Sequence, residues 1–277
     1  MDAVEFERRA ALVGPQYETP TASEVPGREA YGWIDFQGLP NTRDLGGLFG
    51  ADGRRVKRGL LLRSGALGFA RGRDLDRLRE DYNLRLVVDL RNSDELSELP
   101  DPMDAFPGAR FVHANILASE ALGITQEQSA REEVERLRRE LARASDPVES
   151  MVILYPHMLL DEQGRCGYRD FFQAILACDE GAALWHCYVG RDRCGMASAL
   201  METALGVDRA EIERDYLATN VYAPRELTEN GAASLRSLRA AFDAAEREYD
   251  SVLGYIVEAL GITEDELATL RNRYLEA

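Results

Sequence analysis

Short apolar runs alternate with amphipathic stretches along most of the chain. Runs rich in branched and aromatic residues predict strands at 33–36, 59–63, 85–90, 110–114 and 183–186. Apolar residues recur at helical spacing over 71–81, from Ser93 onward, over 168–178, after Arg193 and over 209–217. Strands that alternate with helices are typical of an α/β fold, so we expect a central, mainly parallel sheet flanked by helices.

Helices dominate the second half of the chain, from Gly167 to the C-terminus. Two further helices are expected there, bounded by Gly254 and Gly261, because glycine often ends a helix. Residues 1–30 mix charged residues with prolines and show no sustained period. We therefore expect an N-terminal extension over 1–30 and a single domain over 31–277, which is an ordinary domain size.

The composition is that of a globular protein with a strongly negative charge. The 277 residues are 45% hydrophobic and 30% charged, and the net charge is −16 at pH 7. This charge disfavours nucleic acid and anionic membranes as partners, and any phosphate site must create its own positive field. Since the chain has neither an apolar run of ~20 residues nor a signal-peptide pattern, we expect a cytoplasmic protein without a stable membrane anchor.

The candidate chemistry lies in one segment, which reads HCYVGRDR at 186–193. It places a cysteine, five residues and an arginine between a buried strand and a long helical stretch. Such a loop can curl so that its N–H groups point inward, and the helix adds the positive end of its dipole. A thiol at the floor of this loop is stabilised as the thiolate, with a pKa below the usual ~8.5. Cys187 and Arg193 are therefore the candidate nucleophile and phosphate-binding cation.

The other positions of the loop fit phosphoryl transfer through a cysteinyl-phosphate. The expected phosphate ligands are the backbone N–H groups of Tyr188, Val189, Gly190, Arg191, Asp192 and Arg193. Asp192 is the candidate general acid, because a phosphate dianion nearby favours its protonated form. The alternative is that Asp192 only pairs with an arginine. The remaining cysteines have neither zinc-knuckle nor disulfide-framework spacing, and no metal site is expected.

Several ordered motifs resemble a known family. The loop is similar to the HCxxGKDRTG motif of the atypical bacterial tyrosine phosphatases. Similar blocks follow the order of that family: NTRDLGG at 41–47, LLRSG at 61–65, VVDLR at 87–91, DYLATN at 215–220 and YDSVLGY at 249–255. The resemblance runs from about Trp33 to the C-terminus. It implies a cysteine-phosphatase fold, activity without a metal or organic cofactor, and Asp192 as the acid.

The resemblance also implies the partners. The expected substrate is a phosphorylated protein or a small phosphomonoester, chiefly phosphotyrosine, with phosphoserine, phosphothreonine or phosphoinositides as further possibilities and inorganic phosphate as product. His186 is expected either to hydrogen-bond within the loop and support the thiolate or to be a simple core histidine. Asp89 and Arg91 are expected to form a structural ion pair. The residues expected to brace the loop without touching substrate are Asn41, Arg43, Asp44 and Arg63.

Two positions depart from the family motif. Arg191 stands where the family has lysine, which puts phosphoinositide activity in doubt because a guanidinium is not a compact ammonium. Cys194 replaces a threonine or serine whose hydroxyl would support the departing thiolate. Since a thiol is a weaker donor, we expect slow breakdown of the phosphoenzyme. Cys194 is also a candidate partner of Cys187 in a reversible disulfide.

A run of Glu and Arg over 126–144 carries Val134, Leu137 and Leu141 on one stripe. It is either a solvated amphipathic helix or, as the resemblance suggests, part of a helical lid inserted at about 120–160. Two rival functions remain open at this stage. One is a phosphate-sensing module that hydrolyses little, and the other is a sulfur-transfer or arsenate-reducing enzyme built on the same loop.

Overall fold

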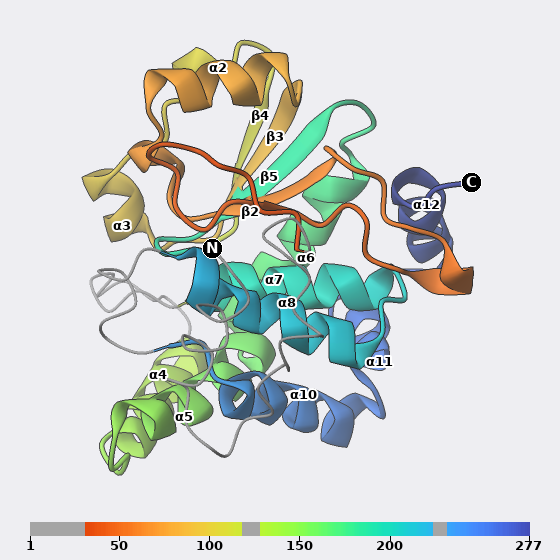
Figure 1. Ribbon diagram of the computed structural model, residues 1–277. Coiled ribbons are helices and arrows are strands. Elements are labelled where there is room, and N and C mark those ends of the chain that lie inside the picture. Colours follow the sequence, from red (N-terminus) through yellow and green to blue (C-terminus); the bar gives the residue numbers. More distant parts are fainter. Residues whose placement is uncertain (1–30, 118–127, 224–231) are drawn as a thin grey trace.

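The computed structural model describes residues 31–117, 128–223 and 232–277. The extension predicted at 1–30 and the beginning of the lid predicted at about 120–160 lie outside these residues. The described residues form an α/β fold in which a sheet is covered by helices on both faces (Figure 1). Within this part of the chain, no helix combines the length and the apolar character needed to cross a bilayer.

The sheet has the strand order β1-β2-β5-β3-β4. Its strands are β1 (Arg43–Asp44), β2 (Leu61–Ser64), β3 (Leu84–Asp89), β4 (Arg110–His113) and β5 (Ala182–His186). The strand β5 pairs in parallel with β2 and β3, β4 pairs in parallel with β3, and β1 is antiparallel to β2. The predicted mainly parallel sheet is confirmed. Every residue of the central strand β5 is buried.

The strand predicted at 33–36 is wrong. Trp33 makes only an isolated bridge to Arg43, which itself belongs to the first strand, β1. Gly32 turns the chain with a φ of 62°, and the N–H of Phe36 bonds to the carbonyl of Ile34. The segment therefore curls instead of extending, and Ile34 enters the smaller of two hydrophobic clusters from this loop, with Phe36 packed against it.

Two hydrophobic clusters lie on the two faces of the sheet, because successive strand residues point to opposite sides. Along β5, Leu184 joins the smaller cluster beneath α2 (Gly72–Glu80), and Trp185 joins the larger cluster. The larger cluster is covered by most of the helices, as expected for a helical C-terminal half. The other helices are α3 (Ser93–Glu98), α4 (Gln128–Leu141), α5 (Pro147–Leu160), α6 (Glu162–Leu176), α7 (Asp192–Ala204), α8 (Arg209–Tyr222), α10 (Leu235–Tyr249), α11 (Val252–Glu258) and α12 (Glu264–Tyr274).

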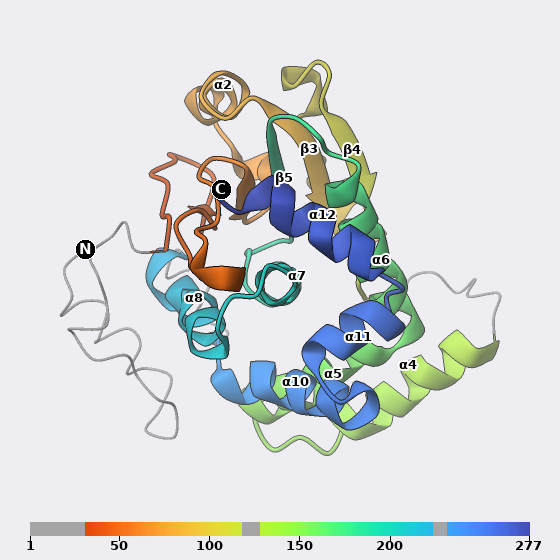
Figure 2. The same ribbon diagram turned by 90° about the vertical axis from the view of Figure 1, so that its right-hand side faces the viewer.

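Helix α7 lies at the centre of the helical layer. Figure 2 shows it end-on, with α6, α8, α11 and α12 arranged around it. Small residues permit this close packing: a Cβ on Gly195 would lie 3.1 Å from the ring of Tyr216 on α8. The residues of α7 are therefore buried almost without exception, and none is exposed.

Three predicted helix boundaries need correction, and one of them is the end of α8, which extends to Tyr222 and not only to 217. Helix α6 begins at Glu162, before the predicted 168, because Gly164 and Gly167 interrupt the helical signal without ending the helix. Gly254 does not bound a helix either. It lies in the first turn of α11, where its N–H bonds to the Ser251 hydroxyl, and the break before α11 falls at Asp250 with a φ of 63°. Gly261, with a φ of 70°, separates α11 from α12 as predicted.

Candidate active site

The loop that follows β5 carries the predicted nucleophile. Parallel strand β5 brings His186 and Cys187 to the carboxyl edge of the sheet, where ligands bind in open α/β sheets. Helix α7 begins at Asp192, so Arg193 lies in its first turn. Gly190 has a φ of 76°, and a Cβ there would lie 2.6 Å from the carbonyl oxygen of Ser64. Only glycine lets the loop approach the end of β2 this closely.

Two side chains hold the carbonyl of Gly190 from outside the loop. The Nδ2 of Asn41 donates to it at 2.8 Å, and the Nη2 of Arg63 donates at 3.0 Å. A trans peptide points its C=O and N–H in opposite directions, so the N–H of Arg191 faces away from these two donors. The expected bracing residues Asn41 and Arg63 thus lie where they fix the orientation of a loop peptide.

Arg43 and Arg63 share one buried carboxylate, that of Asp215 on α8. The Nε of Arg43 lies 3.1 Å from its Oδ1, and the Nη1 of Arg63 lies 2.6 Å from its Oδ2. Burial would raise the pKa of Asp215, but the two guanidinium charges outweigh burial and lower it. Glu202 lies close to this group, and burial raises its pKa well above the ordinary value. Two guanidiniums and one carboxylate leave one net positive charge on the Arg43–Arg63–Asp215 cluster beneath the loop.

Asp44 lies elsewhere than expected. Its carboxylate accepts the N–H of Gly46 at 2.8 Å and the N–H of Gly59 at 2.7 Å. These contacts close the connection between β1 and β2, because a short carboxylate satisfies turn amides well. Asp44 therefore supports the strand that carries Arg63, and it does not contact the loop directly.

Arg193 is held by Glu95, a residue that the motifs do not include. The Nη2 of Arg193 donates to Oε1 of Glu95 at 2.8 Å, and Nη1 donates to Oε2. Glu95 also accepts the N–H of Asn92 in the capping box that starts α3. Burial would raise the pKa of Glu95, but its hydrogen bonds and the charge of Arg193 lower it. The sequence shows the capping box and gives no sign that the same carboxylate reaches α7.

Asp192 contacts both an arginine and a tyrosine. The Nε of Arg191 lies 3.1 Å from each carboxylate oxygen, and the hydroxyl of Tyr155 on α5 donates to Oδ1 at 2.7 Å. The hydroxyl of Tyr216 lies 2.5 Å from that of Tyr155. The side chain of Asp192 remains 25% exposed. Asp192 therefore forms the ion pair with an arginine, Arg191, and its carboxylate also remains partly exposed to solvent.

A shallow pocket adjoins Asp192, with about 340 Å³ of empty space when the open solvent at its mouth is counted. Apolar side chains of α5 line one part of it, and polar groups from α8, α10 and the loop line the rest. The lining residues are Pro147, Val148, Met151, Tyr155, Arg191, Asp192, Tyr216, Ala232, Ser234 and Ser237.

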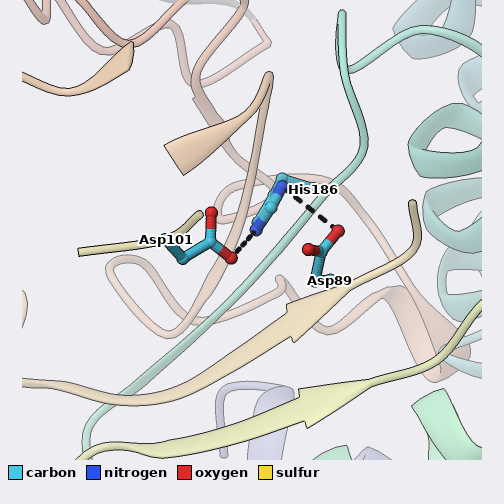
Figure 3. A group of neighbouring side chains, drawn as sticks. All are labelled: Asp89, Asp101 and His186. Atoms are coloured by element: carbon cyan, nitrogen blue, oxygen red, sulfur yellow. Dashed lines mark hydrogen bonds and ion pairs between the residues drawn. The ribbon is translucent and has the colours of Figure 1, made fainter. Parts of the chain in front are cut away.

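His186 bonds mainly outside the loop. Figure 3 shows its ring between Asp101 and Asp89, with Nε2 2.9 Å from Oδ2 of Asp101 and Nδ1 3.8 Å from Oδ1 of Asp89. Its contact with the loop is a 3.3 Å approach of Nδ1 to the carbonyl of Cys187. Burial would lower the pKa of His186, but the two aspartates outweigh burial and raise it. The two aspartates thus favour the charged form of the ring that directly precedes Cys187.

The same three side chains have donor atoms within 4.8 Å of one another, as a metal site would require. However, the Nη2 of Arg91 donates to Asp89 at 2.8 Å and to Asp101 at 3.0 Å. A metal ion would have to displace this buried guanidinium. The cluster is therefore a satisfied ion-pair network, and Asp89 and Arg91 form the expected structural ion pair.

Cys194 is fully buried on α7 and does not donate into the loop. Its Sγ lies 3.7 Å from the carbonyl oxygen of Trp185 on β5, a long contact for a weak donor. Burial raises its pKa to about 12, so it remains a thiol at neutral pH. All four cysteines, Cys166, Cys178, Cys187 and Cys194, are free thiols.

Known proteins place these features in one family. The sequence model of the tyrosine phosphatase family matches residues 34–276. A protein of Cupriavidus necator named "Putative tyrosine-protein phosphatase" is 33% identical over 290 residues, covering 96% of this chain and 95% of its own. The "Tyrosine-protein phosphatase" of Nostoc commune is 24% identical over 238 residues, covering 76% of this chain and 74% of its own. A match that spans both the sheet and the helical half covers the whole described fold, and the chain belongs to the tyrosine phosphatase family.

Proposed function

We propose that this member of the tyrosine phosphatase family hydrolyses phosphotyrosine through a cysteinyl-phosphate on Cys187. The observation that carries the proposal is the position of Cys187 after a buried parallel strand, with Arg193 in the first turn of the next helix. This order of strand, loop and helix supports a site in which Cys187 is the nucleophile, and in which the loop amides and Arg193 would hold the phosphate. Family membership makes a phosphomonoesterase the expected enzyme class.

In the first step, the Cys187 thiolate attacks phosphorus, the phosphorus–oxygen bond to the phenol breaks, and Asp192 gives its proton to the departing oxygen. In the second step, Asp192 takes a proton from water, the water oxygen attacks phosphorus, and the thiolate leaves. Inorganic phosphate is the product. The net positive charge of the Arg43–Arg63–Asp215 cluster lies beneath the loop that follows β5, and the His186 ring directly precedes Cys187.

Phosphotyrosine is favoured over phosphoinositides as the substrate. Arg191, which stands where the family has lysine, pairs with Asp192 through Nε. A guanidinium that is paired with the Asp192 carboxylate is less available to bind the additional phosphates of an inositol ring. The apolar side chains of α5 in the pocket suit an aromatic leaving group instead.

A phosphate-binding module with little turnover is a second candidate, because of Cys194. Its thiol lies against the carbonyl of Trp185, and so it offers little support to a departing thiolate. Such a protein would form the phosphoenzyme and release phosphate slowly. The two candidates differ in the second step of the reaction.

The test uses para-nitrophenyl phosphate with the unaltered protein, Cys187→Ser and Cys178→Ser. Cys178 is the matched control, since it is a buried cysteine before the opposite end of β5. We expect steady turnover in the unaltered protein and in the control, none in Cys187→Ser, and a phosphate adduct on the Cys187 peptide after acid quenching. Turnover by Cys187→Ser would overturn the proposal, and a stoichiometric burst without turnover would favour the binding module.

A further inference from the structure

Two tyrosines from different helices form a hydrogen-bonded chain that ends on Asp192. The hydroxyl of Tyr216 on α8 lies 2.5 Å from that of Tyr155 on α5, and the hydroxyl of Tyr155 lies 2.7 Å from Oδ1 of Asp192. The two rings meet edge to face, at 6.3 Å and 86°. The three groups are thus held in one fixed arrangement at the wall of the pocket.

We propose that Tyr155 is a positioning residue for Asp192, and that Tyr216 holds Tyr155 in place. This inference rests on the proposed role of Asp192 as general acid. Tyr155 fixes the carboxylate through Oδ1, so that Oδ2 is the oxygen that carries the proton to the leaving group.

Both tyrosine hydroxyls are protonated, and this supports a hydrogen bond in which Tyr155 donates to Asp192. Tyr155 and Tyr216 are almost completely buried. Burial and the charge of Asp192 raise the pKa of Tyr155 well above its ordinary value, and burial also raises that of Tyr216. Both hydroxyls therefore keep their protons at neutral pH. A buried hydroxyl needs a partner, and for Tyr155 the acceptor is the carboxylate.

The two oxygens of Asp192 differ in their surroundings. Oδ1 accepts from Tyr155 and from Arg191, whereas among the described residues Oδ2 contacts only Arg191. A carboxylic acid donates from the oxygen that has fewer donors around it, since two donors cannot face each other. Oδ2 is therefore the proton-bearing oxygen. Without the Tyr155 hydroxyl, the carboxyl group could rotate and present either oxygen.

The pocket gives this orientation a purpose. Tyr155 and Tyr216 line the pocket together with the apolar α5 residues Pro147, Val148 and Met151. A leaving group bound in the pocket would lie next to Asp192. Helix α5 would contact this leaving group and, through Tyr155, would also orient the carboxyl group of Asp192. Catalysis by a positioned acid depends on sub-ångström placement, so the loss of one anchor lowers the rate without lowering affinity.

The experiment compares para-nitrophenyl phosphate with phenyl phosphate, because nitrophenolate leaves readily without a proton and phenolate does not. For Tyr155→Phe we expect kcat/KM to fall about tenfold for phenyl phosphate and less than about twofold for nitrophenyl phosphate. KM should be nearly unchanged. Tyr216→Phe should show a smaller loss with the same substrate dependence, and it carries the test if thermal denaturation shows that Tyr155→Phe does not fold.

Tyr255→Phe is the matched control. It removes another buried tyrosine hydroxyl, which donates to the carbonyl of Leu159 at 2.6 Å and has no link to Asp192. The control should affect both substrates equally. In an Asp192→Asn background, Tyr155→Phe should cause no further loss.

The positioning role and the general-acid role fail in different ways. Equal losses on both substrates, no loss, or an additive loss in the Asp192→Asn background would overturn the positioning role while turnover by Cys187 stands. If Asp192→Asn itself shows no preference for the better leaving group, the general-acid assignment fails and the positioning role fails with it.

Discussion

Several side chains near the candidate site bind more than one partner. The sequence reveals many of these residues but not the contacts that they share. The carbonyl of Gly190 is held by Asn41 and Arg63, and Asp215 is shared by Arg43 and Arg63. Asn41, Arg43 and Arg63 lie in motifs whose order along the chain is recognisable. That Arg43 and Arg63 share the carboxylate of Asp215 is visible only once α8 is packed against the sheet.

The residues that the sequence missed are contributed by distant elements. Glu95 reaches Arg193 across 98 residues, and Tyr155 reaches Asp192 across 37 residues. Glu95 looks like a capping residue and Tyr155 like a core aromatic, and each does have that local role. No local pattern records their second contact, which depends on how helices pack in three dimensions.

Asp215→Asn should cost more stability than any substitution of an exposed ion pair. It leaves two buried guanidiniums without their shared charge, and breaking such a pair costs about 3 kcal/mol or more. The measurement is the free energy of unfolding in urea. Asp76→Asn is the control, because Asp76 forms an exposed pair with Arg79, and its loss should be much smaller than that of Asp215→Asn. Equal losses in the two variants would contradict the shared role of Asp215.

Cys194→Thr should accelerate the second step of the reaction. A hydroxyl is a better donor than the thiol that lies against the Trp185 carbonyl. A hydrogen bond of about 1 kcal/mol to the departing thiolate corresponds to a roughly fivefold faster breakdown of the phosphoenzyme. Rapid-mixing kinetics should show a smaller burst and faster steady turnover. An unchanged burst and rate would mean that position 194 does not limit this step.

Among the elements, strands β3, β4 and β5 were the most predictable, and they lie within one residue of their expected positions. Strands β3 and β5 are mostly buried runs of a parallel sheet, which leave a continuous apolar signal in the sequence. The two-residue strand β1 and the curled segment 33–36 were not, because turn residues decide their course. Helix α6 was shortened in the prediction by two glycines that serve close packing: a Cβ on Gly167 would lie 2.7 Å from the carbonyl oxygen of Asn115.

The loop between β5 and α7 should tolerate no side chain at Gly190. Gly190→Ala adds a left-handed strain of about 1 kcal/mol and places a Cβ against the Ser64 carbonyl. Thermal denaturation and turnover measure the two consequences. Gly261→Ala is the control, since Gly261 has a φ of 70° but a Cβ added there would meet no atom within 4 Å. If the two variants lose equal stability and Gly190→Ala remains active, the close approach to β2 does not matter.

The molecule as a whole is acidic, yet four of its arginines are buried close to the candidate site. Arg43, Arg63, Arg91 and Arg193 are buried near the carboxyl edge of the sheet, although the chain carries a net charge of −16. Burial strengthens electrostatic interactions, because the surroundings screen charge less than water does. Arg91 and Arg193 are paired with carboxylates, whereas the Arg43–Arg63–Asp215 cluster keeps one net positive charge, which the overall charge of the molecule opposes.

The stability of the fold should fall as the pH rises above the range where His186 is charged. Its pKa in the folded state is raised above the ordinary 6.5 by Asp101 and Asp89. This contribution is complete below pH 6.5 and is lost as the pH rises through the folded-state value. Urea unfolding at several pH values measures the slope, which His186→Gln should flatten.

His157 requires its own variant in this experiment. Its pKa is also raised, by Asp161 and Glu140, so it contributes a slope of the same sign. His157→Gln should remove only that part and leave the remainder in place. A slope that is unchanged in His186→Gln would contradict the charged state of His186.

The position of α7 restricts how this chain can diverge. A helix with a solvent-exposed face tolerates single substitutions on that face, but α7 has no exposed residue on any face. An exchange that alters volume on α7 must be matched by a compensating exchange on a neighbouring helix or strand. Relatives that keep this architecture should therefore vary at α7 in correlated pairs, and the helix that carries Arg193 should change more slowly than the helices around it.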